Sequence, residues 1–183
     1  LPTRISYPSA DTNRRGPSGP AAAGPLRRAP RGRRTPRALG ASSRAAPRPH
    51  ARGGLGVVTI DDRMYAVGGT AEQDPLYPPV AYVEVYDPAS DTWEARAAMP
   101  TPRRDFTAVV IDGVLLTIGG MGSGAQHSAA VEAYDPRTDT WTQRSPIPVA
   151  CVGVGAAYQG LVYFFAVETK PPNPLPATLV YDP

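Results

Sequence analysis

The sequence has one cysteine and no long apolar run. Because Cys151 is the single cysteine, an intrachain disulfide is excluded and the redox compartment stays open. No stretch approaches the roughly 18–20 apolar residues that a membrane-spanning helix needs. The N-terminal residues also lack the apolar core of a secretory signal. We therefore expect no membrane span and leave the compartment unassigned, with the cytoplasm as the default.

Histidine is scarce as well, and its two copies are far apart. His50 lies where a basic tail meets the rest of the chain, and His127 lies in a polar loop. Two separated imidazoles do not make the ligand set of a transition-metal site. Cys151 lies in an apolar stretch without a neighbouring cation to activate it, so we interpret it as a buried, inert thiol. The sequence thus predicts no metal, no cofactor and no catalytic residue.

Acidic residues are nearly absent from the first 52 positions. This segment holds twelve Arg, no Lys and one acidic residue, a net charge of +11, whereas residues 53–183 carry −8. The basic pI of the whole chain therefore describes a tail joined to an acidic body, and it does not by itself indicate nucleic-acid binding. Residues 1–48 mix Pro, Arg, Ala and Gly without periodicity, so we predict a disordered tail.

Three functions are open for this tail. Its arginines could bind nucleic acid or another acidic surface, although the aromatic residues that stack on bases are almost missing. An Arg-rich, acid-poor start also resembles an organelle transit peptide. We favour a third interpretation, in which the segment is a linker or translated upstream sequence, and we expect no nucleic-acid partner.

The rest of the chain repeats itself. Val114-Leu-Leu-Thr-Ile-Gly-Gly120 is followed by Tyr134-Asp-Pro136 and Trp141, and the same series occurs earlier, ending at Trp93. A third copy begins at Leu161 and reaches Tyr181-Asp-Pro183. The two tyrosine intervals are 48 and 47 residues. A period near 50 residues is typical of repeat architectures.

Each repeat reads as four short antiparallel strands. In the first, Val57–Ile60 and Met64–Val67 flank a tight turn, Ala81–Tyr86 alternates apolar and polar residues, and a strand follows Asp91. Such a sheet is apolar on both faces, so neighbouring sheets must cover it. Radial stacking of these sheets gives a β-propeller, in which Trp93 and Trp141 are large enough to fill the space between blades.

The pattern resembles the Kelch repeat. Its marks are a strand ending in Gly-Gly, a Tyr-Asp-Pro turn and a Trp six or seven residues after the Tyr. We assign blade 1 to about 49–100, blade 2 to about 101–148 and an incomplete blade 3 to about 149–183. The third copy departs from the family, since Ala166-Val167 replace the glycine pair. The repeat-signature residues, with a structural role, are Gly68, Gly69, Tyr86, Asp87, Trp93, Gly119, Gly120, Tyr134, Asp135 and Trp141.

The resemblance implies an all-β, partial Kelch-type propeller, a fragment of a longer one. It also implies a binding or interaction module for a protein or carbohydrate-type ligand, with self-association possible through uncovered blade faces. The alternative is a fragment of a Kelch-type enzyme, similar to a sugar oxidase or an epimerase, whose catalytic residues lie outside this chain. We lean against enzymatic activity.

The candidate binding residues are polar and lie in blade-connecting segments. Arg103, Arg104 and Asp105 join blade 1 to blade 2, and His127 lies in the loop 121–128 of blade 2. Paired guanidinium groups suit a carboxylate-bearing partner. The competing interpretation is structural: an Arg–Asp pair, or Arg–carbonyl bonds, would hold adjacent blades together. Arg52 occupies the place of Arg103 one repeat earlier, and Cys151 occupies it one repeat later.

Overall fold

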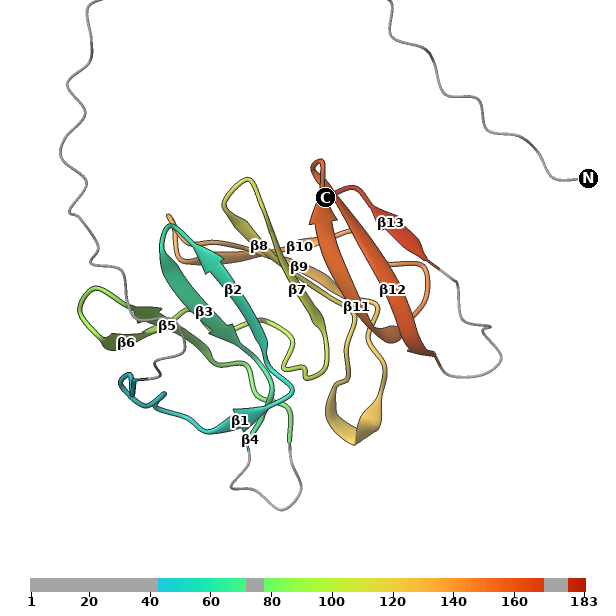
Figure 1. The fold of residues 1–183 in the computed structure, drawn as a ribbon. Coiled ribbons are helices and arrows are strands. Elements are labelled where there is room, and N and C mark those ends of the chain that lie inside the picture. Colours follow the sequence, from blue (N-terminus) through green and yellow to red (C-terminus); the bar gives the residue numbers. More distant parts are fainter. Residues whose placement is uncertain (1–42, 72–77, 170–177) are drawn as a thin grey trace, which may run out of the picture. The chain divides into compact units, whose positions relative to one another are not determined.

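The computed structural model describes residues 43–71, 78–169 and 178–183 (Figure 1). Most of the predicted tail, and the middle of the loop 70–79, lie outside these residues. The described part is almost entirely β-structure. Its elements are β1 (Arg52–Gly53), β2 (Gly56–Ile60), β3 (Arg63–Val67), β4 (Thr70–Ala71), β5 (Val83–Asp87), β6 (Thr92–Arg96), β7 (Thr107–Ile111), β8 (Val114–Ile118), the 3-10 turn η1 (Ser123–Ala125), β9 (Val131–Asp135), β10 (Thr140–Arg144), β11 (Cys151–Tyr158), β12 (Leu161–Thr169) and β13 (Leu179–Tyr181).

The predicted four-stranded repeat is confirmed twice. One sheet has the order β2-β3-β5-β6 and a second has the order β7-β8-β9-β10, with antiparallel pairing throughout. The third sheet, β11-β12-β13, has three strands within the described part of the chain. We call these sheets blade 1, blade 2 and blade 3. Strands β2, β7 and β11 lie side by side, so the first strand of each blade is the one nearest its neighbours (Figure 1).

Short turns join the first two strands of each blade and, in blades 1 and 2, the last two strands as well. Asp61 and Asp62 both have positive φ, of 49° and 63°, which is the geometry of a two-residue hairpin turn that follows the twist of the strands. In the Tyr-Asp-Pro turns the Asp side chain accepts a backbone N–H two residues later, from Ala89 to Asp87 and from Arg137 to Asp135. These Asx-type bonds fix the turn before the fourth strand.

The glycine pairs are required by close packing at the end of the second strand. Gly69 and Gly120 have φ of 98° and 92°, values that residues with a side chain rarely adopt. A Cβ on Gly69 would lie 2.5 Å from the Gly53 carbonyl oxygen, and one on Gly120 would lie 2.6 Å from the Cβ of Phe106. The second glycine of each pair therefore admits the segment that leads into the first strand of a blade.

Two apolar clusters lie between the blades. The first joins blade 1 to blade 2 and has Tyr65, Leu115 and Tyr134 among its buried residues; the second joins blade 2 to blade 3 around Leu116 and Phe164. The tryptophans are less buried than the sequence suggested. Trp141 packs at the edge of the first cluster, and its Nε1 atom donates to the Ala97 carbonyl. Tyr134 is fully buried and fills space between blades 1 and 2 that the tryptophans were expected to fill.

The outer face of blade 1 is covered in part by residues 45–48. A pocket of about 230 Å³ lies there, lined by Ala45, Ala46, Arg48, Val57, Met64, Ala66, Tyr86 and Trp93. The Nε1 atom of Trp93 donates to the Ala46 carbonyl, as Trp141 does to Ala97 in blade 2. Ala46 thus occupies, against blade 1, the place that Ala97 occupies against blade 2. On blade 3 the outward side chains Val154, Phe165 and Val180 are exposed.

Candidate binding face

One end of the blades carries the segments that the sequence singled out. Here β1 pairs with β4, and the equivalent residues of blade 2, Arg104 and Met121, form an isolated bridge (Figure 1). We call this end the loop face; it contains the segments 49–54, 69–71, 78–82, 102–105 and 119–130. The opposite end holds the hairpin turns, and we call it the turn face.

Arg103 is completely buried, although the sequence made it a candidate binding residue. Its Nη1 atom donates to the carbonyl oxygens of Gly119 at 2.6 Å and Ala130 at 3.0 Å. Its Nη2 atom donates to Thr117 at 2.8 Å and Glu132 at 2.6 Å. Burial lowers the pKa of the guanidinium, and the facing carboxylate opposes that change. With an exposed fraction of 0%, the side chain has no surface to offer a partner.

The bonds of Arg103 match the structural interpretation of that residue. The side chain bonds within blade 2, whereas its carbonyl oxygen accepts the N–H of Gly69 in blade 1 at 2.9 Å. Arg103 therefore links the two blades, one through its side chain and the other through its backbone. In the third repeat the Cys151 carbonyl accepts the N–H of Gly120 in the same way. Burial raises the pKa of the Cys151 thiol, in keeping with an unreactive side chain.

Arg52 repeats this arrangement in blade 1. Its Nη1 atom donates to the carbonyl oxygens of Gly68 at 2.8 Å and Tyr82 at 2.9 Å, and its Nη2 atom lies 2.6 Å from Glu84. Burial lowers its pKa and Glu84 opposes the change. The two buried Arg–Glu pairs thus anchor corresponding points of the two blades.

Arg104 and Asp105 lie at the surface of the loop face and pair with each other. The Nη1 atom of Arg104 is 2.7 Å from the Asp105 carboxylate, and both side chains are about one-third exposed. The Arg104 backbone exchanges hydrogen bonds with Met121, of 2.9 and 2.8 Å. Asp105 has φ of 53°, and its N–H donates to the Gly54 carbonyl of the preceding blade. This geometry orients both side chains outward between two blades.

His127 lies near the same place. It forms an isolated bridge with Met121, which in turn pairs with Arg104, and its side chain is half-buried. The structure thus brings Arg104, Asp105 and His127 together on the loop face and leaves Arg103 beneath them. Beside Arg104 lies a groove of about 440 Å³. Its lining, which we call the Arg104 groove, consists of Pro78, Pro79, Arg104 and residues 122–125.

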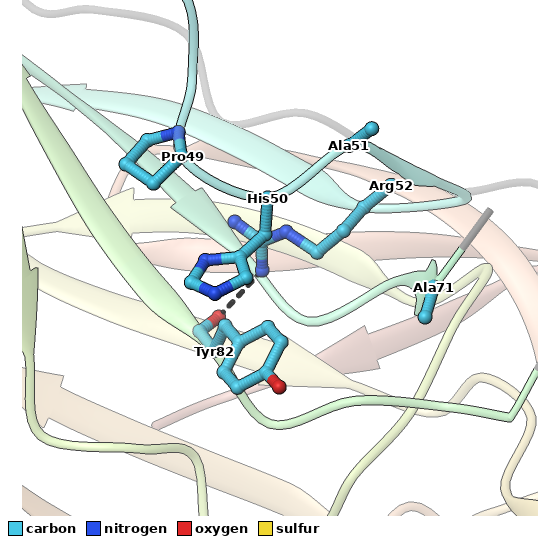
Figure 2. Close-up of a pocket in the computed structure, with 6 residues that line it drawn as sticks. All are labelled: Pro49, His50, Ala51, Arg52, Ala71 and Tyr82. Atoms are coloured by element: carbon cyan, nitrogen blue, oxygen red, sulfur yellow. Dashed lines mark hydrogen bonds between the residues drawn. The ribbon is translucent and has the colours of Figure 1, made fainter. Parts of the chain in front are cut away.

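A second pocket on the loop face contains a histidine that the sequence analysis had placed only at the tail junction. Figure 2 shows His50 over Tyr82, next to Arg52, in a pocket of about 210 Å³. The Nδ1 atom of His50 lies 2.6 Å from the Glu84 carboxylate. In blade 2 the same position is filled by Thr101, whose hydroxyl lies 2.6 Å from Glu132. Aligning residues 46–52 with 97–103, a shift of 51, would have revealed this substitution.

Residues 43–71, 78–169 and 178–183 contain no group of three or more His, Cys, Asp or Glu side chains placed to hold a metal ion. In the same ranges no helix has the length and apolar character to cross a membrane.

The four-stranded antiparallel sheets have their strands in sequence order and pack face to face, which is the architecture of β-propeller blades. A buried Arg–Glu pair recurs at corresponding positions of blades 1 and 2. The family model of the Kelch motif matches residues 51–100 and 102–148, more than half of the chain. The protein therefore belongs to the Kelch-repeat family. The solved structure of YjhT is similar, with a TM-score of 0.54 and 27% identity over 67% of this chain and 35% of that one.

Curated relatives match across one to two repeats. The influenza virus NS1A-binding protein homolog of Mus musculus is 37% identical over 75 residues, which is 41% of this chain and 11% of that protein. Kelch-like protein 33 of Homo sapiens is 33% identical over 85 residues, 46% of this chain and 15% of that protein. Beta-scruin of Limulus polyphemus is 31% identical over 78 residues, which is 43% of this chain and 8% of that protein. The matched segments thus span at most 15% of these relatives.

Proposed function

We propose that this chain is an interaction module that binds a protein partner through the loop face. The observation that carries the proposal is the Arg104 groove, which lies between segments of two adjacent blades. Its lining combines two prolines, a partly exposed guanidinium and a glycine-containing turn whose backbone is open to a partner. A groove of this kind suits an extended peptide segment. Such a peptide can form hydrogen bonds with the exposed backbone of the turn and can place a carboxylate against the Arg104 guanidinium.

The relatives support a role of this class. One of them is named for binding the influenza virus NS1A protein, and others are named as Kelch-like proteins. The comparisons do not favour the alternative of a Kelch-type enzyme. Arg104, Asp105 and His127 remain our proposed contact residues, whereas we assign Arg103 to the support of the blade.

The experiment compares one arginine on each end of the blades. A phage-displayed library of random peptides is selected on the wild-type protein, and the enriched peptides are titrated against two variants. Arg104→Ser changes the groove, and Arg137→Ser changes an exposed arginine of the turn face. We expect Arg104→Ser to weaken binding about tenfold, equivalent to roughly 1.4 kcal/mol, and Arg137→Ser to leave it unchanged. Equal losses in both variants, or a loss confined to Arg137→Ser, would contradict the proposal.

A further inference from the structure

The pocket around His50 is built on a buried ionic support. Glu84 is almost completely buried, and one carboxylate oxygen accepts from Arg52 at 2.6 Å while the other lies 2.6 Å from the Nδ1 atom of His50. A carboxylate only accepts hydrogen bonds, so Nδ1 must carry a proton. The tautomer and the orientation of the imidazole are therefore set from beneath. The other ring nitrogen, Nε2, has no hydrogen-bond partner among the described residues and remains available to a ligand.

The walls of the pocket hold the imidazole in place. The rings of His50 and Tyr82 are stacked with centroids 4.4 Å apart, and the Arg52 guanidinium carbon lies 5.7 Å from the Tyr82 ring centre (Figure 2). His50 and Tyr82 nevertheless stay 54% and 44% exposed. The arrangement is therefore preorganised and also open, which is the combination that a binding site needs.

The charges around the pocket favour an anion. The Arg48 guanidinium donates to the carbonyl oxygens of His50 at 2.8 Å and Arg52 at 3.0 Å, so it is fixed beside the pocket. Arg48 and Arg52 are both positive, and within the described part of the chain Glu84 is the one carboxylate that accepts hydrogen bonds from residues 48–52. Protonation of His50 adds a further positive charge. In addition, the Nε–H of Arg52 is buried without a partner in the described part of the chain.

The chain supplies its own comparison. Blade 2 keeps the buried arginine and glutamate, as Arg103 and Glu132, but it has Thr101 in the place of His50. The threonine hydroxyl donates a hydrogen bond to the glutamate, but threonine has no counterpart of the outward Nε2 atom of His50. The buried pair therefore belongs to the fold of both blades, and only blade 1 adds a side chain that faces outward.

From these observations we infer that the pocket of Pro49, His50, Ala51, Arg52, Ala71 and Tyr82 binds a carboxylate group through the Nε2–H of His50. The Tyr82 ring forms one wall, and Arg48 contributes long-range attraction. The carboxylate can belong to an Asp or Glu side chain of a partner or to a free small dicarboxylate. This inference does not depend on the Arg104 groove. It requires the imidazolium form of His50, in which Nε2 also carries a proton to donate.

The two histidines make the test direct, because the imidazole NMR spectrum contains only His50 and His127. Succinate is titrated into the ¹⁵N-labelled protein at about pH 6, with sodium chloride at matched ionic strength as the control. We expect a saturable shift of the His50 signals with little change at His127. Equal shifts of both histidines, or a linear change without saturation, would overturn the inference.

Two variants separate binding from stability. His50→Thr copies the arrangement of blade 2 and keeps a hydrogen bond to Glu84, and Tyr82→Leu removes the aromatic wall. Followed through the amide signals of Ala51 and Ala71, each is expected to bind succinate about tenfold more weakly. An unchanged His127 signal shows that the variants remain folded. Undiminished binding in His50→Thr would overturn the inference.

The source of the carboxylate is resolved in a parallel titration. The peptide acetyl-Gly-Glu-Gly-Glu-Gly-amide is compared with its glutamine counterpart. Saturable binding of the glutamate peptide alone supports a protein partner, and binding of succinate without the peptide supports a free acid. If neither probe binds, the inference is wrong, while the result with Arg104→Ser still decides the proposed function separately.

Discussion

The Nη2 atom of Arg103 lies 2.6 Å from the Glu132 carboxylate, and both side chains are fully buried, with exposed fractions of 0% and 1%. A charge taken out of water in this way is stable only when its partner and its hydrogen bonds are all present. Five further hydrogen-bond acceptors surround the guanidinium: the carbonyl oxygens of Thr101, Gly119 and Ala130, the hydroxyl of Thr117 and, at 3.9 Å, the sulfur of Met99. The pair is therefore an anchor of the connection between blades 1 and 2.

Removing one charge of this pair should destabilise the protein strongly. We expect Glu132→Gln to lower the free energy of unfolding by about 3–5 kcal/mol, because Arg103 is then left buried without its counter-charge. The matched control is Asp135→Asn, which alters a pair whose arginine, Arg137, is 79% exposed; little or no loss of stability is expected there, because water screens the pair. Urea unfolding measures both. Similar losses for the two variants would contradict the assigned role.

The two tryptophans should fix different segments of the chain, because Trp93 bonds to Ala46 and Trp141 bonds to Ala97. Trp93→Phe removes the hydrogen bond to Ala46, so the segment at residues 45–48 should separate more often from blade 1. We expect faster tryptic cleavage after Arg44, followed by mass spectrometry, because a protease acts on the transiently opened chain. Trp141→Phe removes the equivalent bond to Ala97, which lies between blades 1 and 2, and should leave the rate of cleavage after Arg44 unchanged. Equal rates in both variants would argue against the contact of Ala46.

The glycine pairs allow a test of close packing against backbone strain. Gly120→Ala places a Cβ 2.6 Å from Phe106 in addition to forcing an alanine to positive φ, and we expect a loss of about 3 kcal/mol. Gly113→Ala also has positive φ, of 79°, but its Cβ would meet no atom within 4 Å. That variant should lose only about 1–2 kcal/mol. Thermal or urea unfolding of the two variants gives the difference.

The loss of folding stability at acidic pH should depend in part on Asp139. Hydrogen bonds from the Tyr134 hydroxyl, at 2.6 Å, and from the Ala97 N–H, at 2.9 Å, lower the pKa of this carboxyl from its ordinary value of 3.8. The resulting stability is present above the unfolded pKa and is lost as the pH falls through the folded one. Asp139→Asn, which tolerates the positive φ of 53°, should therefore differ from wild type more at about pH 6 than at about pH 2.5. A pH-independent difference would contradict this assignment.

Much of the fold was predictable because the repeat signature describes local chemistry. The Gly-Gly pairs mark positive φ and a close approach, the Tyr-Asp-Pro turns mark Asx bonds, and short apolar runs or alternating apolar and polar residues mark the strands. Tertiary packing was less accessible. On size alone the tryptophans were expected to fill the space between the blades, but Trp141 is only partly buried, with its Nε1 bonded to the Ala97 carbonyl, and Tyr134 is the fully buried ring.

The candidate site was only partly readable. Three consecutive residues, Arg103, Arg104 and Asp105, look alike in sequence as polar groups in a connection, and nothing local shows that the first turns inward to Glu132. His50 was overlooked for a related reason. Its importance comes from Glu84, which is 34 residues away in the chain and reaches it only across the sheet.

The most direct test of the account is a hydrogen–deuterium exchange footprint of the protein with a peptide selected on it. Binding through the loop face should slow exchange at residues 104 and 121–127, with the turns at 87–91 and 135–139 unchanged. Protection confined to those turns, or to the outer faces of blade 1 and blade 3 around Met64 and Phe165, would contradict a binding role for the loop face.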